Sequence, residues 1–495
     1  MAALRQLAGQ TVIYGMSSIV GRLLNYLLVP LYTYTFSETA YGVVTELYAY
    51  TAFLFVVFTY GMETAFFRFY EKKDRDPKVF STGQSSLVVS TVVFTTVLFV
   101  FAPQLTELLY LRAPEFIRIF ALILAFDALS ALPFARLRAR HKALSFAGIK
   151  LVNIGLNIGL NLFFLVGLPA WSGQAHFFGS IADAIYQPAW GIFYIFLANL
   201  LASGITLLLL LPQFLQIRWG FDMGLWRSML TYAWPLIIVG LAGIVNETLD
   251  RILLKFLLPG TPFDNQAAIG IYGACYKLSI LMTLFIQAYR YAAEPFFFAQ
   301  SKKEDAKTTY SLSLTAFFLV GTLIFLGVML YMDIFQYFIG PEFRVGLHIV
   351  PILLIANLFL GVYYNLSIWY KLTDKTGLGA WVAGGGAILT LILNLILIPA
   401  IGYEGAAWTT LAVYVSMTVA SWWLGQRFYP VHYPVGRLLF FLGLSLGLYG
   451  LSAGLQEWGL TNDLTLRLLV HTVLLMVFLA VVWWIERPLQ RWRTV

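Results

Sequence analysis

Basic side chains inside long apolar stretches are the residues of this chain best suited to bind an anion. Arg22, Arg251 and Arg290 each lie within such a stretch. Asn25 follows Arg22 by three residues, and Lys277 precedes Arg290 in the same stretch. Arginine stays charged and donates paired hydrogen bonds that match the oxygens of a phosphate. Arg22 has no acidic residue within four positions, so we expect it to have a partner elsewhere in the fold or an anionic ligand.

Acidic side chains in similar surroundings could bind a proton or a cation. An ionisable side chain in hydrocarbon costs about 2.5–3.5 kcal/mol by insertion measurements, so it usually faces protein or a water-filled cavity. We therefore interpret five carboxylates as candidates for ion coupling or gating. They are Glu46, Asp127, Glu247, Asp250 and Glu294.

A structural role is the alternative interpretation for several of these charges. Glu247 and Arg251 are four residues apart, as are Arg290 and Glu294. Residues at this spacing are neighbours on one helix face, so each pair could neutralise itself. Lys255 could extend its ammonium group to an interface, and we interpret it as structural.

Motifs for catalysis and for nucleotide hydrolysis are missing from the sequence. There is no GKS or GKT phosphate-binding loop, no HExxH, no nucleophile-elbow pattern and no cluster of His or Cys. Cys275 is the single cysteine, so no intramolecular disulfide can form. We therefore expect no enzyme activity, no metal site and no cofactor.

The composition places these residues in a membrane. Of 495 residues, 60% are hydrophobic and 11% are charged, and the mean hydropathy is +0.79, which no ordinary soluble domain reaches. Since one spanning helix takes about 20 residues, we predict an all-α polytopic membrane protein with about 14 transmembrane helices. The expected spans are 9–31, 40–61, 79–103, 115–135, 147–168, 190–212, 234–258, 268–298, 308–332, 348–370, 378–400, 405–425, 438–455 and 468–485.

The distribution of basic residues among the loops predicts the orientation. With these spans, 22 of the 32 Lys and Arg residues lie in loops on one side and four in loops on the other. Lys and Arg are enriched in cytoplasmic loops, so both termini are expected in the cytoplasm. The net charge of +8 has the same explanation, and we expect no nucleic-acid partner.

The two halves of the chain repeat each other at an offset of about 230 residues. Transporters are commonly built from such repeats. We predict two six-helix lobes, at 1–227 and 228–433, related by a pseudo-two-fold axis along the membrane normal, followed by a helical hairpin and basic tail at 434–495. The recurring landmarks are Arg22 and Pro30 with Arg251 and Pro259; Ala40 and Gly42 with Ala268 and Gly270; Glu63 with Glu294; and Arg138, Lys142 and Asn161 with Lys371, Lys375 and Asn394.

Three segments resemble the polysaccharide or oligosaccharide flippases of the multidrug/oligosaccharidyl-lipid/polysaccharide exporter superfamily. GMSSIVGRLLNYLLVPLY at 15–32, followed by Tyr-Gly-Val at 41–43, is similar to the first helix of that family and the start of the second. LPFARLRARHK at 132–142 resembles its basic loop between helices 4 and 5. NLILIPAIGYEGAA at 394–407 is similar to its turn between helices 11 and 12.

The resemblance implies a transporter of the bacterial inner membrane. Its substrate would be a polyprenyl-diphosphate-linked oligosaccharide, moved from the cytoplasmic to the outer leaflet by alternating access. Similarity to the lipid II flippase branch implies cavity arginines in the first and eighth helices, at positions matched by Arg22 and Arg290, and a groove for the prenyl tail between helices 13 and 14. Expected partners are this lipid, H⁺ or Na⁺ as coupling ion, and the polysaccharide polymerase machinery in transient contact; we expect a monomer.

Three other functions remain open at the level of sequence. A multidrug and toxin extrusion type antiporter would export organic cations through a cavity dominated by carboxylates, as Glu46, Asp127, Glu247 and Asp250 allow. A lipid II flippase would differ only in the sugar it carries. A membrane scaffold for a glycosyltransferase complex would not need charges inside the spans.

Overall fold

The computed structural model describes residues 19–73, 75–111, 113–175, 177–215, 220–301, 303–460 and 463–490. Within these ranges the chain is helical, with short π and 3-10 segments and no strand, so the predicted all-α class is confirmed. The chain divides into two compact units. Unit 1 comprises Met1–Gly273 and Thr390–Tyr403, and unit 2 comprises Ala274–Leu389 and Glu404–Val495.

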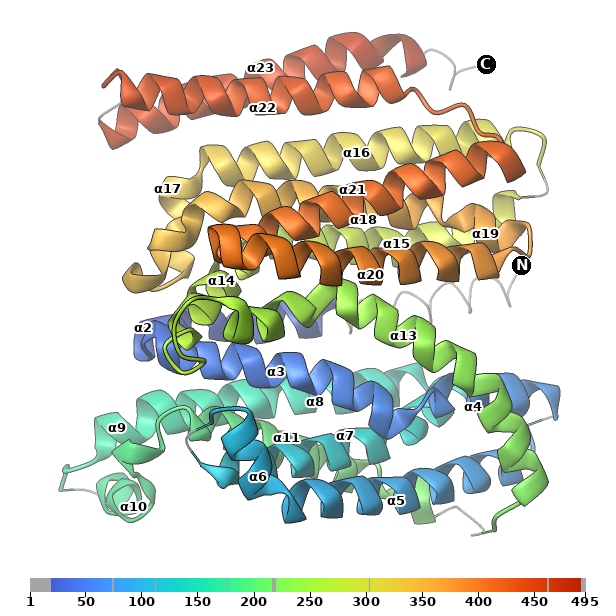
Figure 1. Cartoon of the computed structure of the whole chain (residues 1–495), viewed down its shortest axis with the longest axis vertical. Helices are drawn as coiled ribbons and strands as arrows, with labels where there is room; N and C mark the ends of the chain where they lie inside the picture. Colours follow the sequence, from blue (N-terminus) through green and yellow to red (C-terminus); the bar gives the residue numbers. More distant parts are fainter. Residues whose placement is uncertain are drawn as a thin grey trace. The chain divides into compact units, whose positions relative to one another are not determined.

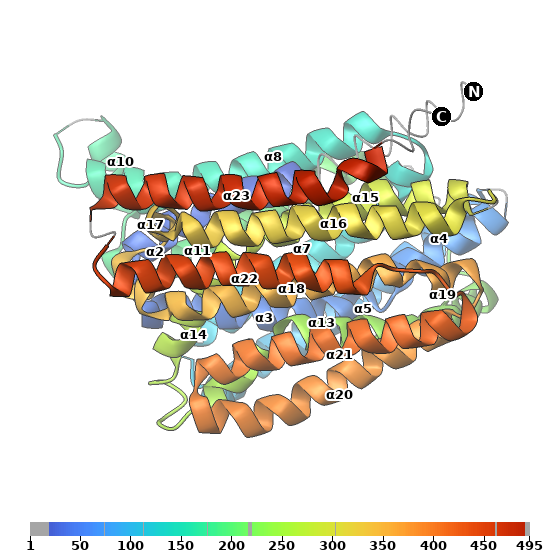
Figure 2. The same cartoon turned by 90° about the horizontal axis from the view of Figure 1, so that it is seen from above.

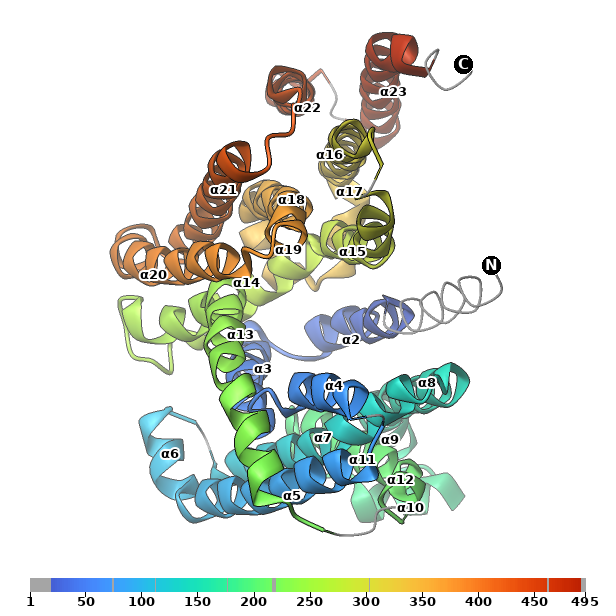
Figure 3. The ribbon, with the colours of Figure 1, turned by 90° about the vertical axis from the view of Figure 1, so that its right-hand side faces the viewer.

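Long helices lie side by side in unit 1 (Figures 1 and 3). Helix α7 (Pro114–Ala139) packs against α5 (Pro77–Val100) and α11 (Phe193–Leu209), and α11 packs against α8 (Ala143–Leu162). Helix α3 (Glu38–Thr59) packs against α7. The other helices that begin in this unit are one over 19–26, α2 (Leu28–Thr35), α4 (Met62–Lys72), α6 (Ala102–Leu108), α9 (Leu168–Trp171), α10 (Phe177–Ile185), α12 (Leu211–Leu215), α13 (Met223–Leu257) and α14 (Gln266–Leu278).

Unit 2 is built around α16 (Ala306–Leu330). This helix packs against α15 (Ile280–Gln300), α18 (Val350–Leu366) and α22 (Val435–Glu457). Helix α23 (Leu464–Gln490) lies along α22 and α16, as Figure 2 shows. The remaining α-helices are α17 (Met332–Phe335), α19 (Ile368–Leu372), α20 (Thr376–Ile401), which ends in unit 1, and α21 (Tyr403–Phe428).

Eleven helices of the described residues are long and apolar enough to cross a membrane, or twelve if the bent pair α14 and α15 is one span. Helix α21 is not among them, although its 26 residues coincide with the predicted span 405–425. The predicted span 9–31 begins outside the described residues. The chain is therefore a multi-pass membrane protein, and the expected number of about 14 spans stays a prediction.

Local sequence explains where two of these helices begin and end. Helix α3 ends because Tyr60 and Gly61 both adopt left-handed backbone angles, with φ of 33° and 69°, and α4 continues the same candidate span as far as Lys72. Helix α13 begins eleven residues before the predicted span at 234, because Asp222 accepts a hydrogen bond from the Leu225 amide at 2.9 Å. That bond holds the pKa of Asp222 below its usual value.

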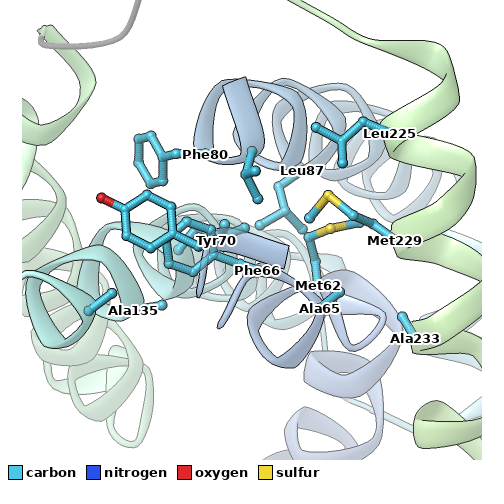
Figure 4. Packing of buried hydrophobic residues seen from close by; sticks show 13 residues of the cluster. Met62, Ala65, Phe66, Tyr70, Phe80, Leu87, Ala135, Leu225, Met229 and Ala233 are labelled. Atoms are coloured by element: carbon cyan, nitrogen blue, oxygen red, sulfur yellow. The ribbon is translucent and has the colours of Figure 1, made fainter. Parts of the chain in front are cut away.

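An apolar core fixes α4 in unit 1. Figure 4 shows Phe66 of this helix beside Phe80 of α5 and Met229 of α13. The rings of Phe66 and Phe80 meet edge to face with centroids 5.8 Å apart, a favourable aromatic geometry. This core positions Glu63 at the start of α4.

Helices α3 and α14 cross at two glycines that the sequence repeat makes equivalent. A Cβ on Gly42 would lie 1.8 Å from the carbonyl oxygen of Gln266, and a Cβ on Gly270 would lie 2.0 Å from that of Glu38. Each glycine thus contacts the backbone of the other helix at the residue four positions before the other glycine. The two contacts are reciprocal, and the two glycines are equivalent positions of the sequence repeat.

Candidate functional site

Arg22 lies in the helix over 19–26, and its side chain is exposed. Among the described residues, its guanidinium makes no hydrogen bond or ion pair. Asn25 is also exposed and accepts a hydrogen bond from Asn157 of α8 at 3.4 Å. In α2, the Tyr32 hydroxyl donates to the buried Asn161 of α8 at 3.0 Å. The first helical segments are thus bound to α8, while the charge of Arg22 is unused within the part of the chain that the structure describes.

Glu46 of α3 is the partner of Lys255 of α13. The ammonium nitrogen lies 2.7 and 2.8 Å from the two carboxylate oxygens, and both side chains are 0% exposed. Lys255 also donates to the carbonyl of Leu109, and Gln266 donates to Glu46 at 3.4 Å. Lys255 is thus fully buried in this ion pair and does not extend to an interface. Without Glu46, its ammonium group would be an uncompensated charge in a low dielectric.

Asp250 is the partner of Arg251 on the same helix. Arg251 Nη1 lies 3.1 Å from the Asp250 carboxylate, which also accepts a hydrogen bond from the Tyr272 hydroxyl at 2.5 Å. Arg251 donates in addition to the backbone carbonyl of Glu247, whose side chain is exposed. Arg251 therefore forms its ion pair with the adjacent Asp250 instead of the expected Glu247, which contributes only its backbone carbonyl.

A cavity of about 650 Å³ lies within unit 1. It contains Asp127, whose carboxylate accepts a hydrogen bond from the Ser203 hydroxyl at 2.7 Å. Five helices contribute the walls. The lining residues are Tyr48, Thr51, Ala52 and Phe55 of α3, Glu63 of α4, Asp127, Ser130, Ala131, Phe134 and Arg138 of α7, Phe146, Lys150 and Asn153 of α8, and Asn199, Ser203 and Thr206 of α11.

The polar groups of this cavity are ordered by contacts between neighbouring helices. Asn153 donates to Thr206 at 2.8 Å, and Asn199 donates to the Tyr48 hydroxyl at 3.1 Å. Lys150 lies with its ammonium nitrogen 4.3 Å from the centre of the Phe134 ring. These contacts fix the side chains while leaving hydrogen-bonding capacity toward the interior.

The predicted residues of unit 2 are arranged differently. Arg290 lies over the Tyr364 ring, with its guanidinium carbon 3.9 Å from the ring centre. Glu294 pairs with Lys371 instead of the expected Arg290. These four residues line a cavity of only about 40 Å³. Lys277 is exposed in α14. The predicted pair of Arg290 and Glu294 is thus wrong, because a cation on α19 and an aromatic ring on α18 provide better partners.

Two ion pairs occupy equivalent positions in the sequence repeat. Glu63 pairs with Arg138 in unit 1, and Glu294 pairs with Lys371 in unit 2. The sequence landmarks had matched Glu63 with Glu294 and Arg138 with Lys371. The same kind of ion pair therefore occurs at equivalent positions of both halves.

Sequence reasoning missed Lys150 and the pairing of Lys255 for different reasons. Helix α8 carries a polar stripe with a spacing of three or four residues, formed by Lys150, Asn153, Asn157 and Asn161. This spacing places them on one helix face, so the sequence alone could have indicated a polar site there. Glu46 and Lys255 are separated by 209 positions, and no local spacing indicates such a pair. Among the described residues, no group of three or more His, Cys, Asp or Glu could hold a metal ion.

The fold resembles those of two classes of membrane transporter. Lipid II flippase MurJ in an inward closed conformation superposes with a TM-score of 0.71 at 13% identity, covering 95% of this chain and 99% of that chain. An inward-facing multidrug resistance MATE family transporter of the MOP superfamily superposes with a TM-score of 0.58 at 13% identity, covering 84% and 94%. The architecture is therefore that of the MurJ and MATE transporters, and at these identities the likeness shows the fold alone.

The sequence itself defines the family. Residues 7–301 match the model of the polysaccharide biosynthesis protein family, and the chain belongs to that family. It is also 22% identical over 260 residues to a probable low-salt glycan biosynthesis flippase of Haloferax volcanii. That match covers 52% of this chain and 50% of the relative, so the chain spans about half the length of the curated relative it matches.

Proposed function

We propose that this protein moves a polyprenyl-diphosphate-linked oligosaccharide from the cytoplasmic to the outer leaflet by alternating access. The observation that carries the proposal is Arg22, an arginine in an apolar stretch whose exposed guanidinium has no partner among the described residues. A diphosphate is costly to bring into hydrocarbon, and a guanidinium replaces part of its hydration with charged hydrogen bonds.

We assign roles to the other basic and amide candidates according to the contacts that each makes in the structure. Arg290, held over an aromatic ring and exposed, is proposed as a second diphosphate contact, and Asn25 and Lys277 as auxiliary donors. Arg251 is bound to Asp250, so we assign it to the support of its own helix.

Coupling to H⁺ or Na⁺ is proposed at a carboxylate that forms no ion pair among the described residues. Glu46, Asp250 and Glu294 are each in an ion pair. Asp127 accepts from a serine hydroxyl, and the Glu247 side chain is exposed. We propose Asp127, with Glu247 as the alternative.

The proposed setting follows the charge of the loops. We place the protein in the inner membrane of a bacterial cell, as a monomer with both termini in the cytoplasm and in transient contact with polysaccharide polymerase machinery. We propose that its domains are two six-helix lobes, at 1–227 and 228–433, and a helical hairpin with a basic tail at 434–495.

Flipping by Arg22 variants tests this function. Purified protein is reconstituted into liposomes with a fluorescent short-chain polyprenyl diphosphate oligosaccharide, and the rate of its appearance in the opposite leaflet is measured. We expect Arg22→Ala to lower the rate at least ten-fold and Arg22→Lys to lower it less, since a point charge remains. Arg118→Ala is the matched control, because Arg118 is an exposed arginine paired with Glu115 at 3.6 Å. Equal rates for Arg22→Ala and the control would contradict the proposal.

An organic-cation antiporter is the second candidate, favoured by Asp127 in a cavity with aromatic walls. The same liposomes, loaded with a fluorescent organic cation and given a proton or sodium gradient, test it. Export of the cation that is lost in Asp127→Asn, without any flipping of the lipid, would select this function.

A further inference from the structure

We propose that the unit 1 cavity binds uncharged sugar rings of the transported lipid, separately from its diphosphate. This inference rests on the proposed function and adds a site to it. The observation is the cavity of about 650 Å³, which lies in the range of about 300–1,000 Å³ typical of small-molecule sites. It provides room for more than one sugar ring.

The charge of the cavity favours a neutral ligand. Two acidic side chains, Glu63 and Asp127, and two basic side chains, Arg138 and Lys150, line it. Arg138 already forms an ion pair with Glu63, which neutralises its charge. A diphosphate would enter a site whose formal charge is balanced, and it would lie near the carboxylate of Asp127. Hydroxyl and amide groups of a glycan meet no such repulsion.

Lys150 provides unused hydrogen-bond donors. Its ammonium group has three N–H donors, and among the described residues its contacts are the Phe134 ring and the electrostatic influence of Asp127, Glu63 and Arg138. The side chain is only partly buried. A polar ligand in the cavity would accept hydrogen bonds from this ammonium group.

The remaining walls suit a sugar ring. Asparagine side chains both donate and accept, which matches neighbouring hydroxyls on a pyranose, and Asn153 and Asn199 face this cavity. Tyr48, Phe55 and Phe134 add aromatic faces, whose negative potential attracts the C–H groups of a sugar. Polar groups between aromatic walls fix both the position and the orientation of such a ligand.

The second half of the sequence repeat lacks these groups. An offset of 233 residues, the difference between Lys371 and Arg138, also relates Asn394 to Asn161. At this offset, the positions equivalent to Asp127, Lys150 and Asn153 hold Leu360, Ala383 and Gly386. The corresponding region of unit 2 has a cavity of about 290 Å³ lined mainly by apolar residues, Gly386 among them. The helices of the second half pack without these polar side chains. We therefore assign Asp127, Lys150 and Asn153 a role in unit 1 other than helix packing.

Flipping by Lys150→Met tests the site. The reconstituted full-length protein is assayed with a short-chain polyprenyl diphosphate carrying a neutral trisaccharide and with the same lipid lacking sugar. We expect Lys150→Met to raise the half-saturating concentration of the trisaccharide lipid about ten-fold, as for one charged hydrogen bond, and to leave the sugarless lipid within two-fold. The control is Lys307→Met, which removes an exposed lysine 5.2 Å from the Tyr429 ring centre.

The outcomes separate this site from the function itself. If neither lipid is flipped by wild type, the proposed function fails. If wild type flips the trisaccharide lipid and Lys150→Met matches it, or if both lipids weaken equally, the sugar site is wrong and the function stands.

A labelling experiment tests the site without transport. In a Cys275→Ser background, Asn199→Cys is modified with a small thiosulfonate reagent. We expect the trisaccharide lipid to slow modification at least five-fold and the sugarless lipid not to slow it. A cysteine at the exposed Ser228 of α13 should be unaffected by either. Equal protection of Asn199→Cys by both lipids, or none, overturns the proposal.

Discussion

A carboxylate and an ammonium group with no exposed surface each need a partner of opposite charge. Glu46 and Lys255 satisfy this condition with two short contacts, and Gln266 adds a third. Removing one partner leaves an uncompensated buried charge, whereas removing both leaves mainly a packing defect. The two kinds of variant should therefore differ strongly in stability.

Lys255→Met should lower the free energy of unfolding by about 3–5 kcal/mol, and Glu46→Gln together with Lys255→Met should lower it by less. Thermal or denaturant unfolding in detergent, followed by intrinsic fluorescence, measures the difference as a double-mutant cycle. Lys307→Met provides the baseline for loss of an exposed lysine. Additive effects of the two substitutions would show that the charges do not stabilise each other.

The sequence predicted which charged residues lie inside the membrane spans, but it did not predict the residues with which they pair. Apolar runs identified Arg22, Asp127 and Asp250 as buried or cavity-facing candidates. The partner of Glu46 lies 209 residues away, and that of Glu294 lies 77 residues away. Such contacts depend on which helices become neighbours, and spacing along one helix carries no information about that.

Two helices can cross closely only where both present a small residue. At the crossing of α3 and α14, Gly42 and Gly270 each face backbone of the other helix. Backbone cannot move aside as a side chain does, so a methyl group at either position must separate the helices. The crossing is therefore sensitive to a single carbon atom.

Gly42→Ala and Gly270→Ala should each destabilise the protein by about 1–3 kcal/mol, the usual range for overpacking. Gly155→Ala on α8 is the matched control, since a Cβ there meets nothing within 4 Å and alanine favours a helix. Melting temperatures of the three variants measure the contrast. A Gly42→Ala protein as stable as Gly155→Ala would show that the helices can separate without cost.

Apolar runs predicted the positions of the long helices well and their ends less well. Helix α16 covers 306–330 against an expected 308–332, and α20 covers 376–401 against 378–400. The large error lies where a polar group acts: Asp222 caps α13, which begins at Met223 instead of the expected 234. Hydropathy does not report such a cap.

Across the whole molecule, the orientation is a separate and testable expectation. In a Cys275→Ser background, Lys73→Cys lies in an expected cytoplasmic loop and Glu115→Cys at the expected outer end of the span 115–135. A membrane-impermeant maleimide added to intact cells should modify Glu115→Cys and not Lys73→Cys, and both after permeabilisation. The opposite pattern would invert the assignment that rests on the basic loops.

The contrast between the two cavities has a consequence for the ancestry of the chain. A symmetric dimer of identical six-helix subunits would carry Lys150 and Asp127 in both copies, because one gene encodes both surfaces. Joining the two halves in one polypeptide frees each position to change alone, so that Leu360 and Ala383 can stand where the other half keeps its charges. Fusion after duplication would thus have let the first half specialise in sugar recognition while the equivalent positions of the second half became apolar.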